Sequence, residues 1–240
     1  MARRLVAETL GTALLVAVVV GSGIAAAQLS PTDTGLQLLE NSAATALGLA
    51  VLILIFGPVS GAHFNLVVSA VDWWLTRHSG SGLAGGEVLG YIVAQVLGGI
   101  TGAVLADVLF DLPPVQISAR DRLSVCHAVG EVVATAGLVL LIFALARTGR
   151  AALSAAAVGA YIGAAYWFTS STSFANPAVT IARIFSDTFA GIAPASAPVF
   201  VAAQLVGGVH GLGLVRYLFP DAAASAAQAV VPQTSTIEKS

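Results

Sequence analysis

The stretch SFANPAVTIAR, residues 173–183, holds the feature on which the fold of this chain depends. Its Asn176 and Pro177 stand directly ahead of an apolar segment. Asn is a preferred helix N-cap, and Pro suits the first helical position. A second stretch, SGAHFNLVVS at 60–69, has the same arrangement with Leu66 in place of the proline. The two stretches are therefore predicted to begin helices in the same way.

The composition of the whole chain is that of an integral membrane protein. Hydrophobic residues make up 57% of the sequence and charged residues 9%, and the mean hydropathy is +0.91. The first apolar run follows Arg3 and Arg4, as in a signal peptide, but it continues without a convincing cleavage site and is interpreted as a retained span. Apolar runs long enough to cross a bilayer core of roughly 30 Å lie at 5–29, 39–59, 86–110, 124–146, 151–170 and 197–219.

Charge and cysteine content exclude several functions. The net charge of −2 is small and unclustered, which gives no support to a nucleic-acid partner. Cys126 is the single cysteine, so the chain has no internal disulfide, and a zinc site with the neighbouring His127 is not expected because adjacent side chains splay apart on a helix. We expect no metal and no cofactor.

The basic residues predict the orientation in the membrane. With the N-terminus inside, only Arg120, Arg122 and Arg183 of the ten basic residues fall on the outer side. The positive-inside rule then places both termini in the cytoplasm. We expect a multi-pass protein of the inner (plasma) membrane.

The chain also repeats itself. AQVLGGITG at 94–102 returns as AQLVGGVHG at 203–211, and HFNLVV corresponds to FANPAV. Close helix packing explains the glycines but not the shared Gln. Each half contains three crossings, an odd number, so the second half is predicted to be inverted relative to the first. The predicted limits are one transmembrane domain at 1–220, repeats at about 1–111 and 122–220, and a disordered cytoplasmic tail at 221–240.

The two Asn-centred segments are too short to cross the membrane. Residues 65–76 and 176–187 would each extend about 18 Å as helix, which is about half-way through the bilayer. Polar loops lead into both, and non-helical backbone at that depth is tolerated only where it is buried in protein or lines a watery cavity. The sequence therefore predicts two re-entrant half-helices whose positive N-terminal ends meet at the centre.

With these features the chain resembles the aquaporin family, the major intrinsic proteins. Paired Asn-Pro-Ala motifs are the mark of that family, and the likeness covers about 5–219. The resemblance implies an aquaporin-like fold, a homotetramer in the lipid bilayer, and one pore per subunit for small neutral solutes. It further implies that Glu8 and Glu131 accept hydrogen bonds from loop N–H groups, and we expect His63 to hydrogen-bond within its loop. The residues that match the two motifs at the pore midpoint are Asn65, Leu66, Val67, Asn176, Pro177 and Ala178.

The chain departs from the family at the outer constriction. Water-selective members have an arginine three residues after the second motif asparagine, and this chain has Val179 there. The other filter positions, carried over by their spacing from the asparagines, are Thr45, Ala164 and Ser173. These four residues are small or medium-sized, so the filter is expected to be wide and to suit solutes larger than water.

Arg183 lies one helical turn beyond Val179 and has two readings. It lines the outer vestibule, or it is a snorkelling charge at the membrane surface.

The missing arginine resembles a bacterial subgroup linked to arsenic resistance. Neutral molecules such as arsenous acid, methylated arsenicals, glycerol and boric acid share the required size and hydrogen-bonding groups. The alternative is an ion-coupled secondary transporter, which would need carboxylates facing a central cavity, whereas Asp107 and Glu87 lie near the ends of spans. A serine hydrolase at PVSG lacks a recognisable base, so we do not expect an enzyme.

Overall fold

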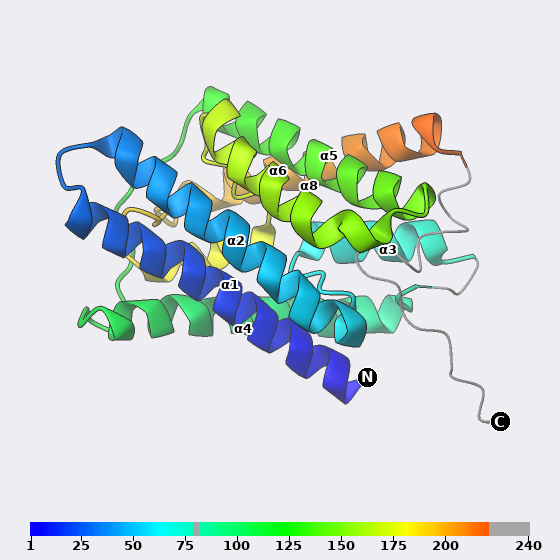
Figure 1. Cartoon of the computed structure of the whole chain (residues 1–240), viewed down its shortest axis with the longest axis horizontal. Helices are drawn as coiled ribbons and strands as arrows, with labels where there is room; N and C mark the ends of the chain where they lie inside the picture. Colours follow the sequence, from blue (N-terminus) through cyan, green and yellow to red (C-terminus); the bar gives the residue numbers. More distant parts are fainter. Residues whose placement is uncertain (79–81, 221–240) are drawn as a thin grey trace.

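The computed structural model describes residues 1–78 and 82–220, and the predicted tail at 221–240 lies outside them. The described residues form helices and connecting loops with no strand (Figure 1). In chain order the elements are α1 (Ala2–Leu29), α2 (Thr34–Ser60), α3 (Leu66–Thr76), α4 (Gly85–Leu109), α5 (Val125–Arg147), the 3-10 turn η1 (Ala151–Leu153), α6 (Ser154–Phe168), α7 (Pro177–Ala182), the 3-10 turn η2 (Arg183–Phe185) and α8 (Ala197–Leu218).

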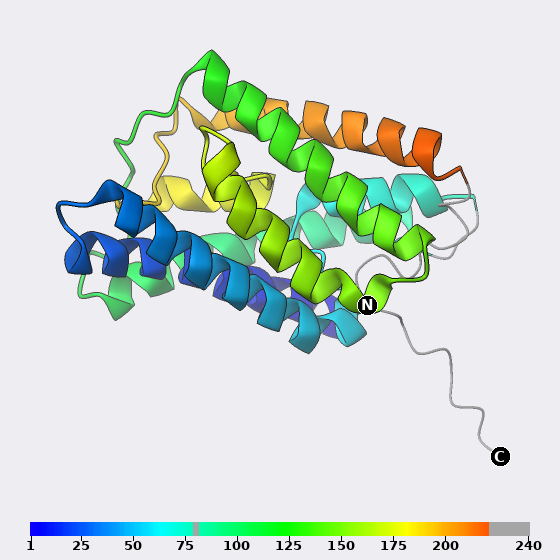
Figure 2. The same ribbon diagram turned by 45° about the horizontal axis from the view of Figure 1, so that its top comes forward.

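Within the described residues, six helical segments are long and apolar enough to cross a membrane, with η1 and α6 counted as one segment. The predicted all-α membrane fold with six spans is therefore confirmed. The beginning of α1 and the end of α8 lie at the same end of the molecule in both views (Figures 1 and 2). We call this the terminal end and the opposite one the distal end.

The two half-helices begin where the sequence predicts. Asn65 caps α3, accepting the Val67 N–H at 2.9 Å, and Asn176 caps α7, accepting the Ala178 N–H at 3.0 Å. Helix α7 and η2 together end at Phe185, two residues before the predicted end. In both views α3 (cyan) and α7 (yellow) lie end to end along the middle of the molecule (Figures 1 and 2).

The second half-helix is shorter because the chain leaves helical geometry at Ser186. That residue is extended, with φ −136° and ψ 114°, and its hydroxyl donates to Asp107 Oδ1 of α4 at 2.8 Å. A side-chain hydrogen bond to a neighbouring helix thus accompanies the end of the segment.

Glycines of the repeated motif let pairs of long helices approach closely. Helix α1 packs along α4, and α5 along α8. A Cβ atom added to Gly102 would lie 2.1 Å from the carbonyl oxygen of Ala13, and one added to Gly207 would lie 2.6 Å from that of Val132. Both contacts are with backbone, so the neighbouring helix could not yield by moving a side chain.

We expect Gly102→Ala to destabilise the protein by about 1–3 kcal/mol, the usual range for overpacking, because α1 and α4 would have to separate. Thermal unfolding in detergent measures the effect. Gly86→Ala is the matched control, since Gly86 lies in the same helix with nothing within 4 Å of the added Cβ. Equal melting temperatures for the two variants would show that the close approach is not needed.

Candidate functional site

The loops that lead into the half-helices share one unusual backbone conformation. In each loop the residues four, three and one before the capping asparagine have positive φ, which is uncommon for residues other than glycine. The angles are 86°, 49° and 48° at Gly61, Ala62 and Phe64, and 63°, 49° and 48° at Thr172, Ser173 and Ala175. This matched geometry supports the relation between the two halves that the sequence repeat suggests.

A fully buried carboxylate holds the first loop. Glu8 of α1 accepts the N–H groups of His63 and Phe64 at 3.0 and 2.8 Å. It also accepts the Ser60 hydroxyl at 2.6 Å and the Gln95 amide at 2.7 Å. Every one of these partners is a donor, so the carboxylate acts only as an acceptor.

Glu131 of α5 holds the second loop in the same way. It accepts the N–H groups of Phe174 and Ala175 at 2.9 and 2.8 Å, and the Gln204 amide at 2.6 Å. The structure thus places Glu8 and Glu131 against the two loops.

Two glutamines that sequence reasoning left without a role connect these carboxylates to the half-helices. Gln95 donates to Ser69 Oγ at 3.1 Å, and Gln204 donates to Thr180 Oγ1 at 2.8 Å. These hydroxyls in turn donate to the backbone carbonyls of the two capping asparagines at 3.1 and 2.9 Å. The Gln shared by the two repeats was the sequence signal for this network.

The asparagines join the two loops crosswise. Asn65 Nδ2 donates to the Ala175 carbonyl at 2.7 Å, and Asn176 Nδ2 donates to the Phe64 carbonyl at 2.6 Å. An amide NH₂ has two N–H donors, so each asparagine retains one that these bonds do not use. Both asparagines line a central cavity.

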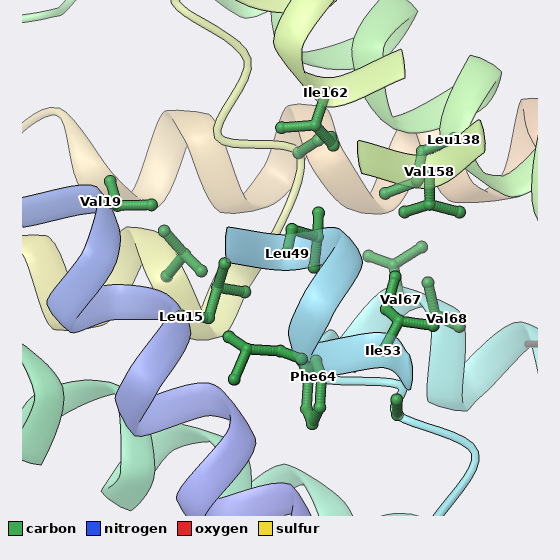
Figure 3. Close-up of a cluster of buried hydrophobic side chains, with 14 of the residues drawn as sticks. Leu15, Val19, Leu49, Ile53, Phe64, Val67, Val68, Leu138, Val158 and Ile162 are labelled. Atoms are coloured by element: carbon green, nitrogen blue, oxygen red, sulfur yellow. The ribbon is translucent and has the colours of Figure 1, made fainter. Parts of the chain in front are cut away.

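This cavity has a largely apolar wall with few polar groups. Its water-accessible volume is about 60 Å³, which is room for about four to six water molecules at 10–15 Å³ each. Buried apolar side chains from several helices lie around the same space (Figure 3). Those that line the cavity and are labelled in the figure are Leu15, Val19, Leu49, Ile53, Phe64, Val68, Leu138, Val158 and Ile162.

The other motif residues lie behind the cavity wall. Leu66, Val67, Pro177 and Ala178 are not among its lining residues, whereas Val68 and Val179, three positions after each asparagine, are. Val67 packs toward Gly208 of α8, where an added Cβ would lie 2.4 Å from Val67 Cγ1.

Three of the four predicted filter residues, Thr45, Ser173 and Val179, line the cavity. Ala164 does not, and the prediction for it is wrong. The face of α6 that lines the cavity carries Val158, Ile162 and Tyr166 at four-residue spacing. Ala164 lies on a different face of this helix and is exposed. Position 164 is two residues from 162 and 166, about 200° around the helix, so it faces away.

Arg183 also lines the cavity, and its side chain is only 2% exposed. The reading as a snorkelling surface charge is therefore wrong. Its Nε donates to the Ala190 carbonyl, and its Cζ lies 3.4 Å from the centroid of the Phe174 ring. Phe174 and Tyr166, which also line the cavity, were missed at the sequence level because no motif marks them.

His63 lines the cavity and its Nδ1 lies 3.1 Å from Ser69 Oγ, so it contacts the half-helix that its loop precedes. Its ring packs edge-on against Tyr91, with centroids 5.4 Å apart. In the part of the chain that the structure describes, no three His, Cys, Asp or Glu side chains are grouped to hold a metal ion.

Comparisons with known proteins agree with this arrangement. The family model described as Major intrinsic protein matches residues 1–173. Aquaglyceroporin AqpS of Rhizobium meliloti (strain 1021) is 48% identical over 238 residues, covering 98% of this chain and 96% of that protein. Aquaporin Z of Photorhabdus laumondii is 37% identical over 111 residues, covering 45% of this chain and 44% of the relative. The X-ray structure of the aquaglyceroporin from Plasmodium falciparum shares the fold, with a TM-score of 0.67, 21% identity, and coverage of 92% of this chain and 98% of that one.

Proposed function

The chain belongs to the major intrinsic protein family, whose members are membrane channels rather than enzymes, and from this premise we propose that it passively conducts small neutral solutes larger than water. The solutes proposed are glycerol and similar polyols, arsenous acid and other metalloid hydroxides, and methylated arsenicals, with water as a further permeant. A relative 48% identical is named an aquaglyceroporin, which supports the polyols.

The observation that carries this proposal is Val179 in the cavity lining, three residues after Asn176. An apolar side chain there leaves that level without a guanidinium fork, which would hold water and obstruct larger molecules. A mostly apolar wall with two asparagine amides suits solutes that have carbon or metalloid centres bearing hydroxyls. Thr45 and Ser173 add hydroxyl groups to the same cavity.

We further propose a homotetramer in the inner membrane with both termini in the cytoplasm. The first span begins and the last span ends at the same end of the molecule, as this topology requires (Figure 1). The excess of basic residues on that side supports the orientation. The distal end, where Arg183 lies, would then face outward.

Stopped-flow measurements on proteoliposomes test the proposed function by comparing water, glycerol and arsenous acid with empty liposomes. We expect all three permeabilities to rise. A rise for water alone would refute the proposal of a wide filter, and no rise for any of the three would refute the channel.

An ion-coupled transporter finds little support in the cavity. Among the described residues that line it there is no Asp or Glu. Asp107 is fully buried beside Ser186 instead, and Glu87 lies 3.4 Å from Arg4 at the other end of α4. Coupling by a proton or cation would need a carboxylate in the pathway.

We expect ions to permeate poorly even though position 179 carries no cation. The positive N-terminal ends of α3 and α7 lie at the cavity, since both capping asparagines line it, and the apolar wall offers little to replace the hydration shell of an ion. Planar-bilayer recordings in sodium chloride at two pH values check this. Sodium or proton currents well above those of the bare membrane would contradict it.

A further inference from the structure

Arg183 is a buried cation that forms no salt bridge with a described residue, although the charge of the buried Glu131 acts on it from behind the loop. Arg4 and Glu87 form the one salt bridge found within residues 1–78 and 82–220. Asp121 accepts the Leu123 N–H and the Ser196 hydroxyl at 2.8 Å each, which holds the pKa of its exposed carboxyl below the usual range. Asp187 accepts the Ala119 N–H at 2.9 Å. A buried charge of this kind is costly unless something compensates it.

The protein compensates part of this charge, but the two terminal NH₂ groups of the guanidinium make no hydrogen bond to a described residue. The Nε of Arg183 donates to Ala190, and one face of the group stacks on Phe174. No acceptor is found for either terminal NH₂ group among the described residues, and neither is fully buried. Since Arg183 is one of the residues that line the cavity, these are the donors that it could offer to a ligand there.

A second unpaired donor lies in the same cavity. Ser173 lines the cavity with Arg183 and is 3% exposed; its Oγ is buried and has no hydrogen-bond partner among the described residues, so this hydroxyl would have to turn toward a ligand to bind it. Tyr166 lines it too, and its hydroxyl lies 3.3 Å from Thr45 Oγ1. Four buried hydroxyls have no partner among the described residues, those of Thr12, Thr135, Ser154 and Ser173, and of these four residues only Ser173 lines the cavity. An unpaired buried hydroxyl needs an explanation, and for Ser173 a ligand or water in the cavity supplies one.

Arg122 holds this arrangement in place from the other side. It donates to the carbonyls of Gly191 at 2.8 Å and Phe189 at 3.1 Å, on either side of the Ala190 carbonyl bound by Arg183. Its Cζ lies 5.1 Å from the centroid of the Phe174 ring. The two arginines therefore brace the same three-residue segment and contact the same ring, which fixes the guanidinium of Arg183 before any ligand arrives.

We propose that the distal end of the cavity is a binding site for a small monovalent oxyanion of the carboxylate class, held end-on by the two terminal NH₂ groups of Arg183 and by the Ser173 hydroxyl. This pairing is planar and bidentate, which a spherical anion cannot match. The apolar wall beyond the site does not solvate a charge, so the bound anion stops there and blocks neutral solutes. The proposal deepens the channel function, because it assigns a blocking ligand to the same pathway.

Formate is the probe, since it fits the small cavity and is ionised at neutral pH. Two measurements are made at constant ionic strength, with sodium formate replacing sodium chloride. Calorimetric titration of the detergent-solubilised protein gives the affinity for formate, and stopped-flow on proteoliposomes gives the water permeability. Formate is expected to bind and to lower that permeability, and chloride is not.

Three variants locate the site. Arg183→Lys keeps the charge but loses the fork, and we expect formate affinity to fall at least about tenfold. Ser173→Ala removes one hydrogen bond and should weaken binding by about fivefold. The control is Arg120→Gln, which removes a charge from an exposed arginine of the same region and should change affinity by less than about twofold.

Two results would overturn the proposal: equal effects of chloride and formate on water permeability, or an equal loss of formate affinity in Arg120→Gln and Arg183→Lys. Either result would mean that a diffuse positive potential, and not a specific site, attracts the anion. If Arg183→Lys does not fold, Ser173→Ala decides alone, and unchanged affinity overturns the site. Glycerol permeability without formate tests the channel function separately, since calorimetry reports binding even in a protein that conducts nothing.

Discussion

Val179→Arg is expected to lower glycerol permeability by about tenfold or more, equivalent to a barrier increase of at least about 1.4 kcal/mol. Val179 is 5% exposed and lines the cavity, so a longer side chain there must extend into the pathway. A guanidinium at that level would bind water and obstruct larger solutes. Water permeability should therefore fall less than glycerol permeability, and stopped-flow measurement of both on the same proteoliposomes gives the ratio.

Two further variants separate size, charge and position. Val179→Leu adds bulk without charge, and we expect it to lower the glycerol to water ratio less than the arginine does. Arg183→Ala tests whether the existing arginine, one turn closer to the distal end, already restricts solutes. A large rise in glycerol flux in Arg183→Ala, together with little change in Val179→Arg, would place the constriction at Arg183 and contradict the proposal for Val179.

The sequence predicted the helices well because each one carries its own signal. Apolar runs gave the six spans, and Asn followed by an apolar segment gave the beginning of both half-helices. The end of the second half-helix depends on a contact between Ser186 and Asp107, which are 79 positions apart. No local pattern reports such a contact, so the predicted end was two residues too late.

The candidate site shows the same division between features that a local sequence pattern predicts and features that depend on tertiary contacts. Thr45, Ser173 and Val179 line the cavity as their spacing from the asparagines suggested, but Ala164 does not. Its assignment counted back through the loop at 169–176, where a fixed residue count says nothing about which helix face points inward. Phe174 gains its place from the arginine stacked on it, a contact that depends on tertiary structure.

The sequence indicated the residues of the polar network behind the loops but not how they pair. Glu8 and Glu131 stood out as charges within apolar spans, and the repeated Gln95 and Gln204 stood out as unexplained. Only the structure shows that each glutamine donates to the glutamate of its own half. Pairing two residues across helices needs the packing of those helices, which periodicity alone does not fix.

Glu131→Gln is expected to cost at least about 3 kcal/mol and to abolish water and glycerol conduction in any protein that still folds. Both Ala175 N–H and the Gln204 amide donate to Glu131 Oε2, and Phe174 N–H donates to Oε1. The substituted side chain has one acceptor oxygen and one NH₂ donor group. Its buried NH₂ group would therefore face groups that are themselves donors, where the carboxylate had presented an acceptor. The second loop, with positive φ at Ser173 and Ala175, would lose the group that holds it.

Thermal unfolding in detergent and proteoliposome permeability check this prediction together. Glu87→Gln is the matched control, because it makes the same change at a partly exposed carboxylate whose partner is Arg4 at 3.4 Å, where a pair contributes little. Glu131→Asp keeps the charge but shortens the side chain by one methylene, so it should retain more stability than Glu131→Gln while conducting poorly. Should Glu131→Gln melt and conduct like Glu87→Gln, the carboxylate is not what shapes the loop, and the loop geometry that carries Ser173 and Asn176 into the cavity must be held by its other contacts, among them the asparagine cross-links.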